Sequence, residues 1–127
     1  MGRAKTILII DDDVDFSGLA SMILAQKGGY EVGVCNQGAN AMTMIREWQP
    51  DLILLDIVMP NVDGTEIAAH LRQDPKLCNI PVIFLTSLMT AQEAAAHPVI
   101  ANYKFISKPI KTEELLRCVK EFFEFGN

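Results

Sequence analysis

Residues 6–13 read TILIIDDD, a run of β-branched and aliphatic side chains that ends in three aspartates. An apolar run without polar alternation is typical of a strand that is buried on both faces of a sheet. The aspartates mark the place where such a strand ends. The pattern therefore predicts a buried strand over 6–10 whose carboxyl end opens onto a polar edge.

The same pattern recurs along the chain, with amphipathic stretches between the apolar runs. Further strands are predicted at 30–35, 52–55, 82–85 and 103–107. Apolar side chains at helical spacing predict helices around 16–24, 41–48, 64–71, 91–96 and 112–123. Five buried strands, each followed by a helix, predict an α/β fold in which helices cover both faces of a parallel sheet.

The composition is that of one ordinary globular domain. The chain has 127 residues, of which 50% are hydrophobic and 21% charged, so it is too short for two typical domains. It contains no apolar run near the roughly 20 residues of a membrane span, and its first residues do not resemble a secretory signal, because the apolar run 7–10 is short and meets three aspartates. The net charge of −5 argues against a broad nucleic-acid-binding face. We expect a cytoplasmic protein with no membrane contact and no direct contact with nucleic acid.

The three cysteines give no sign of a metal or disulfide framework. Cys35, Cys78 and Cys118 are isolated from one another and have no CxxC spacing. An odd number of unpaired cysteines is typical of buried thiols in a reducing compartment. We therefore expect no zinc site and no disulfide.

Polar groups follow four of the predicted strands at the point where each strand ends. They are Asp11 to Asp13 after the first strand, Asp56 after the third, Thr86 after the fourth, and Ser107-Lys108-Pro109 after the fifth. In open α/β sheets, ligands bind at the carboxyl ends of the strands. If these ends converge, several carboxylates share a small site with one lysine and one hydroxyl.

Crowded carboxylates repel one another unless a cation or a proton intervenes. An oxygen-only set of ligands suits Mg²⁺ or Mn²⁺, and no histidine or cysteine stands nearby to favour zinc. A carboxylate can also attack phosphorus as a nucleophile, while a metal and a lysine neutralise the phosphoryl oxygens. The residue types therefore favour phosphoryl transfer to an aspartate. Asp13 fits better as the cap of the first helix than as a ligand.

Four motifs in order resemble the receiver domains of two-component response regulators, the chemotaxis regulators among them. The motifs are IIDDD at 9–13, LLDIVMPNVDG at 54–64, FLTS at 84–87 and ISKP at 106–109. The resemblance covers nearly the whole chain, and makes 1–127 one receiver domain. It implies a flavodoxin-like doubly wound (βα)5 fold with a five-stranded parallel sheet in the order 2-1-3-4-5.

The resemblance also implies roles for individual residues. Asp56 is the expected phosphoacceptor. Asp11, Asp12 and Asp56, with the backbone carbonyl of Val58, are the expected ligands of Mg²⁺ or Mn²⁺. In this scheme Asp12 binds the metal directly, and Asp11 acts largely through water.

Four further residues match the phosphoryl-binding and switching positions of the family. Lys108 is expected to pair with the phosphoryl group, and Pro109 to follow it through a cis peptide bond. Thr86 is expected to donate a hydrogen bond to the phosphoryl group. Phe105 matches the aromatic switch, although a phenylalanine in a strand is equally well explained as plain core.

The implied function is that of a phosphoacceptor signalling module in a phosphorelay. The phosphoryl group would come from a phosphohistidine on a sensor histidine kinase or a histidine phosphotransfer protein. The modified domain would change conformation for a downstream effector protein or a covalently linked output domain. Such a module is not a conventional enzyme, although it catalyses its own phosphorylation and dephosphorylation. Because the last predicted helix ends near Asn127, a stand-alone receiver and a piece of a longer regulator or hybrid kinase both remain open.

Two other classes compete with this reading. A haloacid dehalogenase-like phosphatase would carry a second aspartate two residues after its nucleophile, where this chain has Val58, and no GxGxxG or GxxxxGK loop indicates a nucleotide-binding fold. A degenerate receiver that serves only as a protein-interaction domain would not need the acidic residues that are present here.

The chain also departs from the family pattern. Val58 and Leu88 are apolar where many receivers carry polar side chains, and an apolar group cannot orient an attacking water. We therefore expect slow self-dephosphorylation. The segment AAHPV at 95–99 is also unusual and leaves open how the surface around the fourth helix is used.

Overall fold

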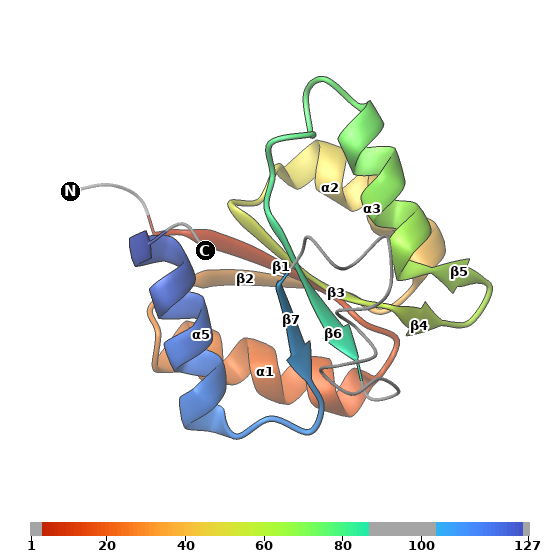
Figure 1. The fold of residues 1–127 in the computed structure, drawn as a ribbon. Helices are drawn as coiled ribbons and strands as arrows, with labels where there is room; N and C mark the ends of the chain where they lie inside the picture. The colour runs from red at the N-terminus through yellow and green to blue at the C-terminus, as the bar shows by residue number, and fades with distance from the viewer. Residues whose placement is uncertain (1–3, 87–103, 126–127) are drawn as a thin grey trace.

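The computed structural model describes residues 4–86 and 104–125, and these form the predicted α/β domain (Figure 1). The main strands are β1 (Thr6–Ile10), β2 (Glu31–Cys35), β3 (Leu52–Asp56), β6 (Val82–Thr86) and β7 (Lys104–Ser107). The helices are α1 (Val14–Gln26), η1 (Gly38–Asn40), α2 (Ala41–Trp48), α3 (Gly64–Gln73) and α5 (Thr112–Phe125). A small hairpin, β4 (Val58–Met59) with β5 (Val62–Asp63), follows β3.

The five main strands form one parallel sheet in the order β2-β1-β3-β6-β7. Counted as the first to fifth parallel strands, this is the order 2-1-3-4-5 that the resemblance implied. The flavodoxin-like fold class is therefore confirmed. β3 lies at the centre, between β1 and β6, and all five of its residues are buried.

Two apolar cores lie on opposite faces of the sheet. On one face, side chains of α1 and α5 such as Leu24 and Val119 pack against β1 and β3. On the other, side chains of α2 and α3 such as Ile45 and Leu71 pack against the same strands. Figure 1 shows the same division, with α1 and α5 on one side of the sheet and α2 and α3 on the other. Burial on both faces explains why the strand sequences are almost uniformly apolar.

The helices end where local sequence signals predict. α1 is followed by Gly28-Gly29, and Gly29 has a φ of 75°, a conformation that glycine adopts without strain. α2 ends before Pro50, with Gln49 in the left-handed region at a φ of 45°. No helix in the two described ranges has the length and apolar character that crossing a bilayer requires.

Some predictions differ from the structure or fall outside it. Tyr30 precedes β2 and does not belong to it, so the predicted strand began one residue early. The β4–β5 hairpin was not predicted. The expected helix at 91–96, the segment 95–99 and Tyr103 all lie outside the described residues.

Candidate functional site

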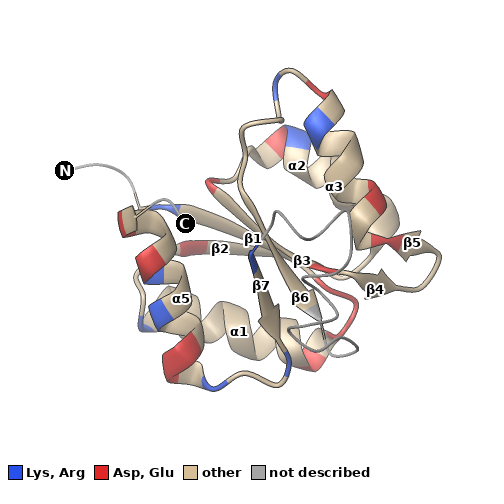
Figure 2. Ribbon diagram, viewed as in Figure 1, with Lys and Arg blue, Asp and Glu red and all other residues tan. Residues whose placement is uncertain are grey.

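Three aspartates gather at the carboxyl edge of the sheet. Asp11 and Asp12 follow β1, and Asp56 is the last residue of β3. One carboxylate oxygen from each residue lies within 4.8 Å of the other two. Asp11 and Asp56 are buried, at 0% and 5% exposure, whereas Asp12 is exposed. Figure 2 shows the acidic colour in the loop after β1 at this edge.

Lys108 follows β7 and reaches into the same cluster. Its Nζ lies 2.6 Å from Oδ2 of Asp11 and 3.8 Å from Oδ2 of Asp56. The lysine side chain is only 11% exposed, so these ion pairs are largely shielded from solvent. The Lys108–Pro109 peptide bond is cis, in agreement with the prediction for Pro109.

Backbone and side-chain hydrogen bonds hold Asp11 in place. Its backbone N–H donates to the carbonyl of Cys35 at 3.0 Å, and its carbonyl accepts from Nδ2 of Asn36 at 2.7 Å. Its Oδ1 accepts from the backbone N–H of Asp13 at 2.9 Å. One carboxylate oxygen is therefore fixed by the loop, and the other faces Lys108.

The side chain of Asp13 caps helix α1. Its Oδ1 accepts a hydrogen bond from the backbone N–H of Phe16 at 3.0 Å, and its backbone has the extended conformation of an N-cap. The interpretation of Asp13 as a cap is confirmed.

Asp56 ends β3 and lies against the first residue of α3. Its Oδ1 accepts from the backbone N–H of Val58 at 3.2 Å. Gly64, the first residue of α3, passes so close that a Cβ there would lie 2.1 Å from the backbone oxygen of Asp56. The Gly64 N–H donates to the carbonyl of Ile57 at 2.8 Å. A glycine at 64 is therefore needed for the helix to start against the strand that carries Asp56.

The surroundings of Asp56 oppose its ionisation. Burial, and after it the nearby charge of Asp11, raise the pKa of its carboxyl group, and the net effect of all its neighbours is a pKa of about 7. The ammonium of Lys108 and the hydrogen bond from Val58 lower the pKa, but not enough to offset the burial. Three carboxylates and one ammonium leave excess negative charge at this edge.

This set of donors fits a hard divalent cation. The converging atoms are carboxylate oxygens, one of the three acids is exposed, and the neighbouring lysine is already engaged with Asp11. Mg²⁺ and Mn²⁺ prefer such oxygen ligands together with water. A cation here would offset the burial and the repulsion from Asp11 that together raise the pKa of Asp56.

The remaining predicted site residues are only partly placed. Thr86 ends β6 and pairs with Ser107 of β7, so its backbone lies at the same edge, while its side chain lies outside the described part. Leu88 is likewise outside. Val58 is 52% exposed beside Asp56. Phe105 is half-buried and packs against the core on the α2–α3 face.

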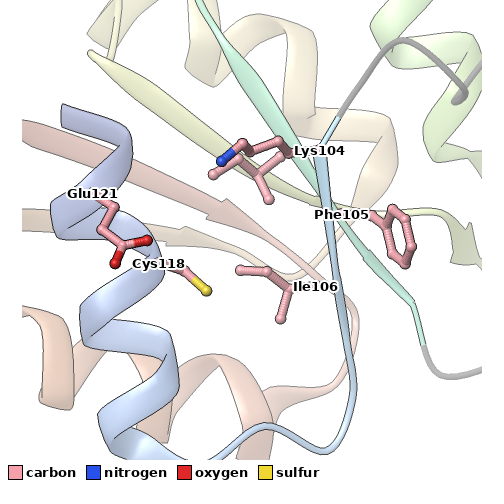
Figure 3. A pocket seen from close by; sticks show the side chains of 6 residues that line it. Lys104, Phe105, Ile106, Cys118 and Glu121 are labelled. Atoms are coloured by element: carbon pink, nitrogen blue, oxygen red, sulfur yellow. The ribbon is translucent and has the colours of Figure 1, made fainter. Parts of the chain in front are cut away.

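A pocket of about 330 Å³ lies between β7 and α5, where Cys118 and Glu121 face β7 (Figure 3). In this view the ring of Phe105 points away from Cys118 and Ile106, toward the other face of the sheet. Among the described residues that line this pocket there is no cluster of acidic groups like that around Asp56. We therefore place the site at the acidic edge.

Three residues around the site were not predicted to contribute to it from the sequence. The Nδ2 of Asn36 bridges the Asp11 carbonyl and the hydroxyl oxygen of the buried Ser17, at 2.7 and 2.8 Å. The ring of Phe16 lies under Lys108, with Nζ 4.6 Å from the ring centroid. From the sequence, Phe16 is only the first apolar residue of the helix predicted around 16–24, and helical spacing gives no signal of a contact with a distant lysine.

Comparisons with known proteins agree with this architecture. A family model described as the response regulator receiver domain matches residues 7–120. The chain is 37% identical over 114 residues to the DNA-binding dual master transcriptional regulator RpaA of Synechocystis sp., covering 90% of this chain and 47% of that protein. It is 30% identical over 116 residues to the DNA-binding response regulator MtrA of Mycolicibacterium paratuberculosis, covering 91% and 50%. The chain thus spans about half the length of these curated relatives.

Solved structures of receiver domains also resemble this chain. The signal receiver domain of a DNA binding response regulator from Colwellia psychrerythraea matches with a TM-score of 0.83 and 25% identity, covering 94% of this chain and 98% of that one. A CheY-like receiver domain protein from Methanospirillum hungatei matches with a TM-score of 0.81 and 26% identity, covering 96% and 95%. The chain belongs to the response regulator receiver domain family of two-component signalling systems.

Proposed function

We propose that this receiver domain accepts a phosphoryl group on Asp56 and relays the signal by a change of conformation. The observation that carries the proposal is the convergence of Asp11, Asp12 and Asp56 on one point, with Lys108 against two of them. An aspartate in such a cluster is a nucleophile whose neighbours can hold the charge of an incoming phosphoryl group.

In the transfer, an Oδ atom of Asp56 attacks the phosphorus of a phosphohistidine. The new bond joins that oxygen to phosphorus, and the bond between phosphorus and the imidazole nitrogen breaks. The electron pair leaves with the nitrogen, which then takes a proton from solvent. Lys108 lies 3.8 Å from Oδ2 of Asp56, near enough to pair with a phosphoryl oxygen on that residue.

Asp11, Asp12 and Asp56, with the backbone carbonyl of Val58, would hold Mg²⁺ or Mn²⁺. When bound, the cation supplies positive charge that favours the ionised form of Asp56 and offsets charge on the phosphoryl oxygens. Asp11 is preset for this role by its hydrogen bonds from Asp13 and Asn36. Thr86, at the end of β6, is the proposed hydroxyl donor to the phosphoryl group.

The proposed partners are those of the family. A sensor histidine kinase or a histidine phosphotransfer protein would donate the phosphoryl group, and an effector protein or a linked output domain would respond to it. RpaA and MtrA are described as DNA-binding proteins, and each is about twice as long as the matched segment. We assign no direct DNA contact to this domain, because its net charge of −5 disfavours a phosphate backbone. We also place the protein in the cytoplasm.

A degenerate receiver that only binds partners is the competing proposal. It predicts no use for the buried ion pair of Lys108 with Asp11, whereas phosphoryl transfer uses both residues. The acidic cluster therefore favours an active receiver.

The test is incubation with phosphoramidate, a small donor with a phosphorus–nitrogen bond, followed by intact-mass measurement. We expect the wild type to gain the mass of one phosphoryl group with Mg²⁺ and to remain unmodified with a chelator. Asp56→Asn should gain nothing under either condition. If the wild type stays unmodified while a known active receiver reacts in parallel, the domain is a degenerate receiver that only binds partners, and our proposal is wrong.

A further inference from the structure

The ammonium of Lys108 has a third neighbour besides the two carboxylates. Its Nζ lies 4.6 Å from the centroid of the Phe16 ring. Phe16 belongs to the first turn of α1, whereas Lys108 follows β7, so the contact joins elements distant in sequence. The lysine side chain is 11% exposed, and a cation over an aromatic face gains most when water is excluded.

The position of Phe16 is fixed from two sides. Its backbone N–H donates to the side chain of Asp13, which sets the first turn of α1. Its ring is half-buried and packs on the core that α1 and α5 build against the sheet. The segment 11–13 therefore positions the carboxylate of Asp11. Through the cap that Asp13 forms, it also positions the Phe16 ring, which faces the same lysine.

A ring suits this position because it attracts the ammonium without competing for its protons. Asp11 accepts from Nζ at 2.6 Å, and Asp56 lies further away at 3.8 Å. A polar side chain at 16 would offer another hydrogen-bond partner and draw Nζ from Asp56. The ring face leaves the remaining protons of Lys108 available to a group on Asp56.

From this geometry we propose that Phe16 is a positioning residue for phosphoryl transfer, acting through a cation–π contact that holds Lys108 beside Asp56. The inference rests on the proposed function of Asp56. In this proposal Phe16 contributes to the reaction as well as to the packing of the core. A merely structural Phe16 would depend on its size and hydrophobicity, while a cation–π role depends on the electron density of the ring.

Fluorination of the ring separates these two roles. Phenylalanine with one, two or three fluorines at position 16 keeps nearly the same shape but weakens the negative ring face step by step. We expect the rate of phosphorylation by phosphoramidate with Mg²⁺ to fall with each fluorine, by about threefold to tenfold over the series. A rate that is flat across the series overturns the inference.

The chain offers a matched control in a second cation–π contact far from the site. Nζ of Lys5 lies 5.8 Å from the centroid of Phe123, at the end of the sheet where β1 begins. The same fluorinated residues at 123 should leave the phosphorylation rate unchanged. An equal decline at 123 would trace the effect to general stability and overturn the role of Phe16.

A spectroscopic measurement tests the contact without phosphorylation. We expect the ε-methylene protons of Lys108 to resonate upfield in the wild type because of the ring current of Phe16, and to return to ordinary shifts in Phe16→Leu. Ordinary shifts in the wild type would overturn the contact itself. If the wild type shows the upfield shift but takes up no phosphoryl group, the proposed function fails while the contact stands.

Discussion

At the scale of single residues, the carboxyl group of Asp56 holds its proton more tightly than an exposed aspartate does. Its pKa is raised from 3.8 to about 7, first by burial and then by Asp11. The folded protein therefore binds more protons than the unfolded chain between about pH 4 and pH 7. By linkage, the metal-free protein loses stability as the pH rises through this window.

Asp56→Asn removes this titration. At pH 8 in a chelator, we expect the variant to be more stable than the wild type by about 1 to 3 kcal/mol, less than the full linkage value because nearby solvent relaxes around the charge. At pH 4 the difference should be close to zero. Urea unfolding at the two pH values measures it, with Glu47→Gln, which changes an exposed acid on α2, as the control variant. The same stability gain at both pH values would contradict the raised pKa.

Val58 bears on the lifetime of the phosphorylated state. Its side chain is 52% exposed beside Asp56 and has no group that could orient an attacking water. We expect Val58→Asn to shorten the lifetime of the phosphoryl group several-fold, whereas Val58→Ala should change it little. The decay is timed by intact mass after the small donor is removed. Equal lifetimes in all three proteins would show that this position does not limit hydrolysis.

Sequence reasoning found the residues whose chemistry is visible in their type and place. Asp11, Asp12, Asp56 and Lys108 were predicted because each follows a buried strand, and the structure brings them together. Phe16 was missed because an apolar helix residue carries no sign of its distant partner. The contact depends on where β7 ends relative to α1, which only the fold determines.

At the scale of elements, the start of α3 sets the position of Asp56. A Cβ at position 64 would lie 2.1 Å from the Asp56 carbonyl oxygen and 2.9 Å from Cα of Ile57, both of them backbone atoms that cannot simply rotate away. We expect Gly64→Ala to destabilise the domain by about 1 to 3 kcal/mol and to slow phosphorylation, because α3 or the end of β3 must shift.

The matched control is Gly18→Ala in α1. Apart from its chain neighbours and the backbone of its own helix, no heavy atom of the described residues lies within 4 Å of a Cβ built at Gly18, which is exposed in mid-helix. This change should stabilise the protein by about 0.5 to 1 kcal/mol, because alanine favours the helix. Denaturant unfolding compares the two variants. A Gly64→Ala protein as stable as the wild type would contradict the proposed close approach.

The strands were predicted well because burial on both faces makes their sequences continuous and apolar. LILLD at 52–56 is the plainest case, and every residue of it is buried. The β4–β5 hairpin could not be predicted in the same way. Its strands have two residues each, and the turn between them places Asn61 at a φ of 65°. Such short pairs are set by the turn and by the packing of Val62 near Gly38, not by periodicity.

At the scale of the whole molecule, folding concentrates negative charge at one edge of the sheet. A divalent cation that binds there should stabilise the folded state. We expect Mg²⁺ at about 100 times its dissociation constant to add about 2.7 kcal/mol to the free energy of unfolding. Thermal unfolding with Mg²⁺ and with potassium at equal ionic strength measures this gain. Asp12→Asn should lose most of it and Glu47→Gln none, whereas equal stabilisation of all three proteins would point to a nonspecific salt effect.

The topology was predicted in two parts. The alternation of apolar runs and amphipathic stretches predicts a parallel sheet covered on both faces, but it does not determine the order of the strands. That order came from the resemblance of four motifs, because neighbouring strands in a parallel sheet are chosen by packing over the whole domain. The observed order β2-β1-β3-β6-β7 places β3 beside β1 and so brings Asp56 to Asp11 and Asp12.

In the proposed reaction, a carboxylate oxygen of Asp56 takes the phosphoryl group. The most direct measurement is to phosphorylate the wild type with phosphoramidate and Mg²⁺, reduce the acyl phosphate with borohydride, and map the reduced residue by peptide mass spectrometry. We predict homoserine at position 56 alone, and none in the chelated sample. Homoserine at position 11 or 12, or a stable modification on a histidine in place of any acyl phosphate, would contradict the central claim.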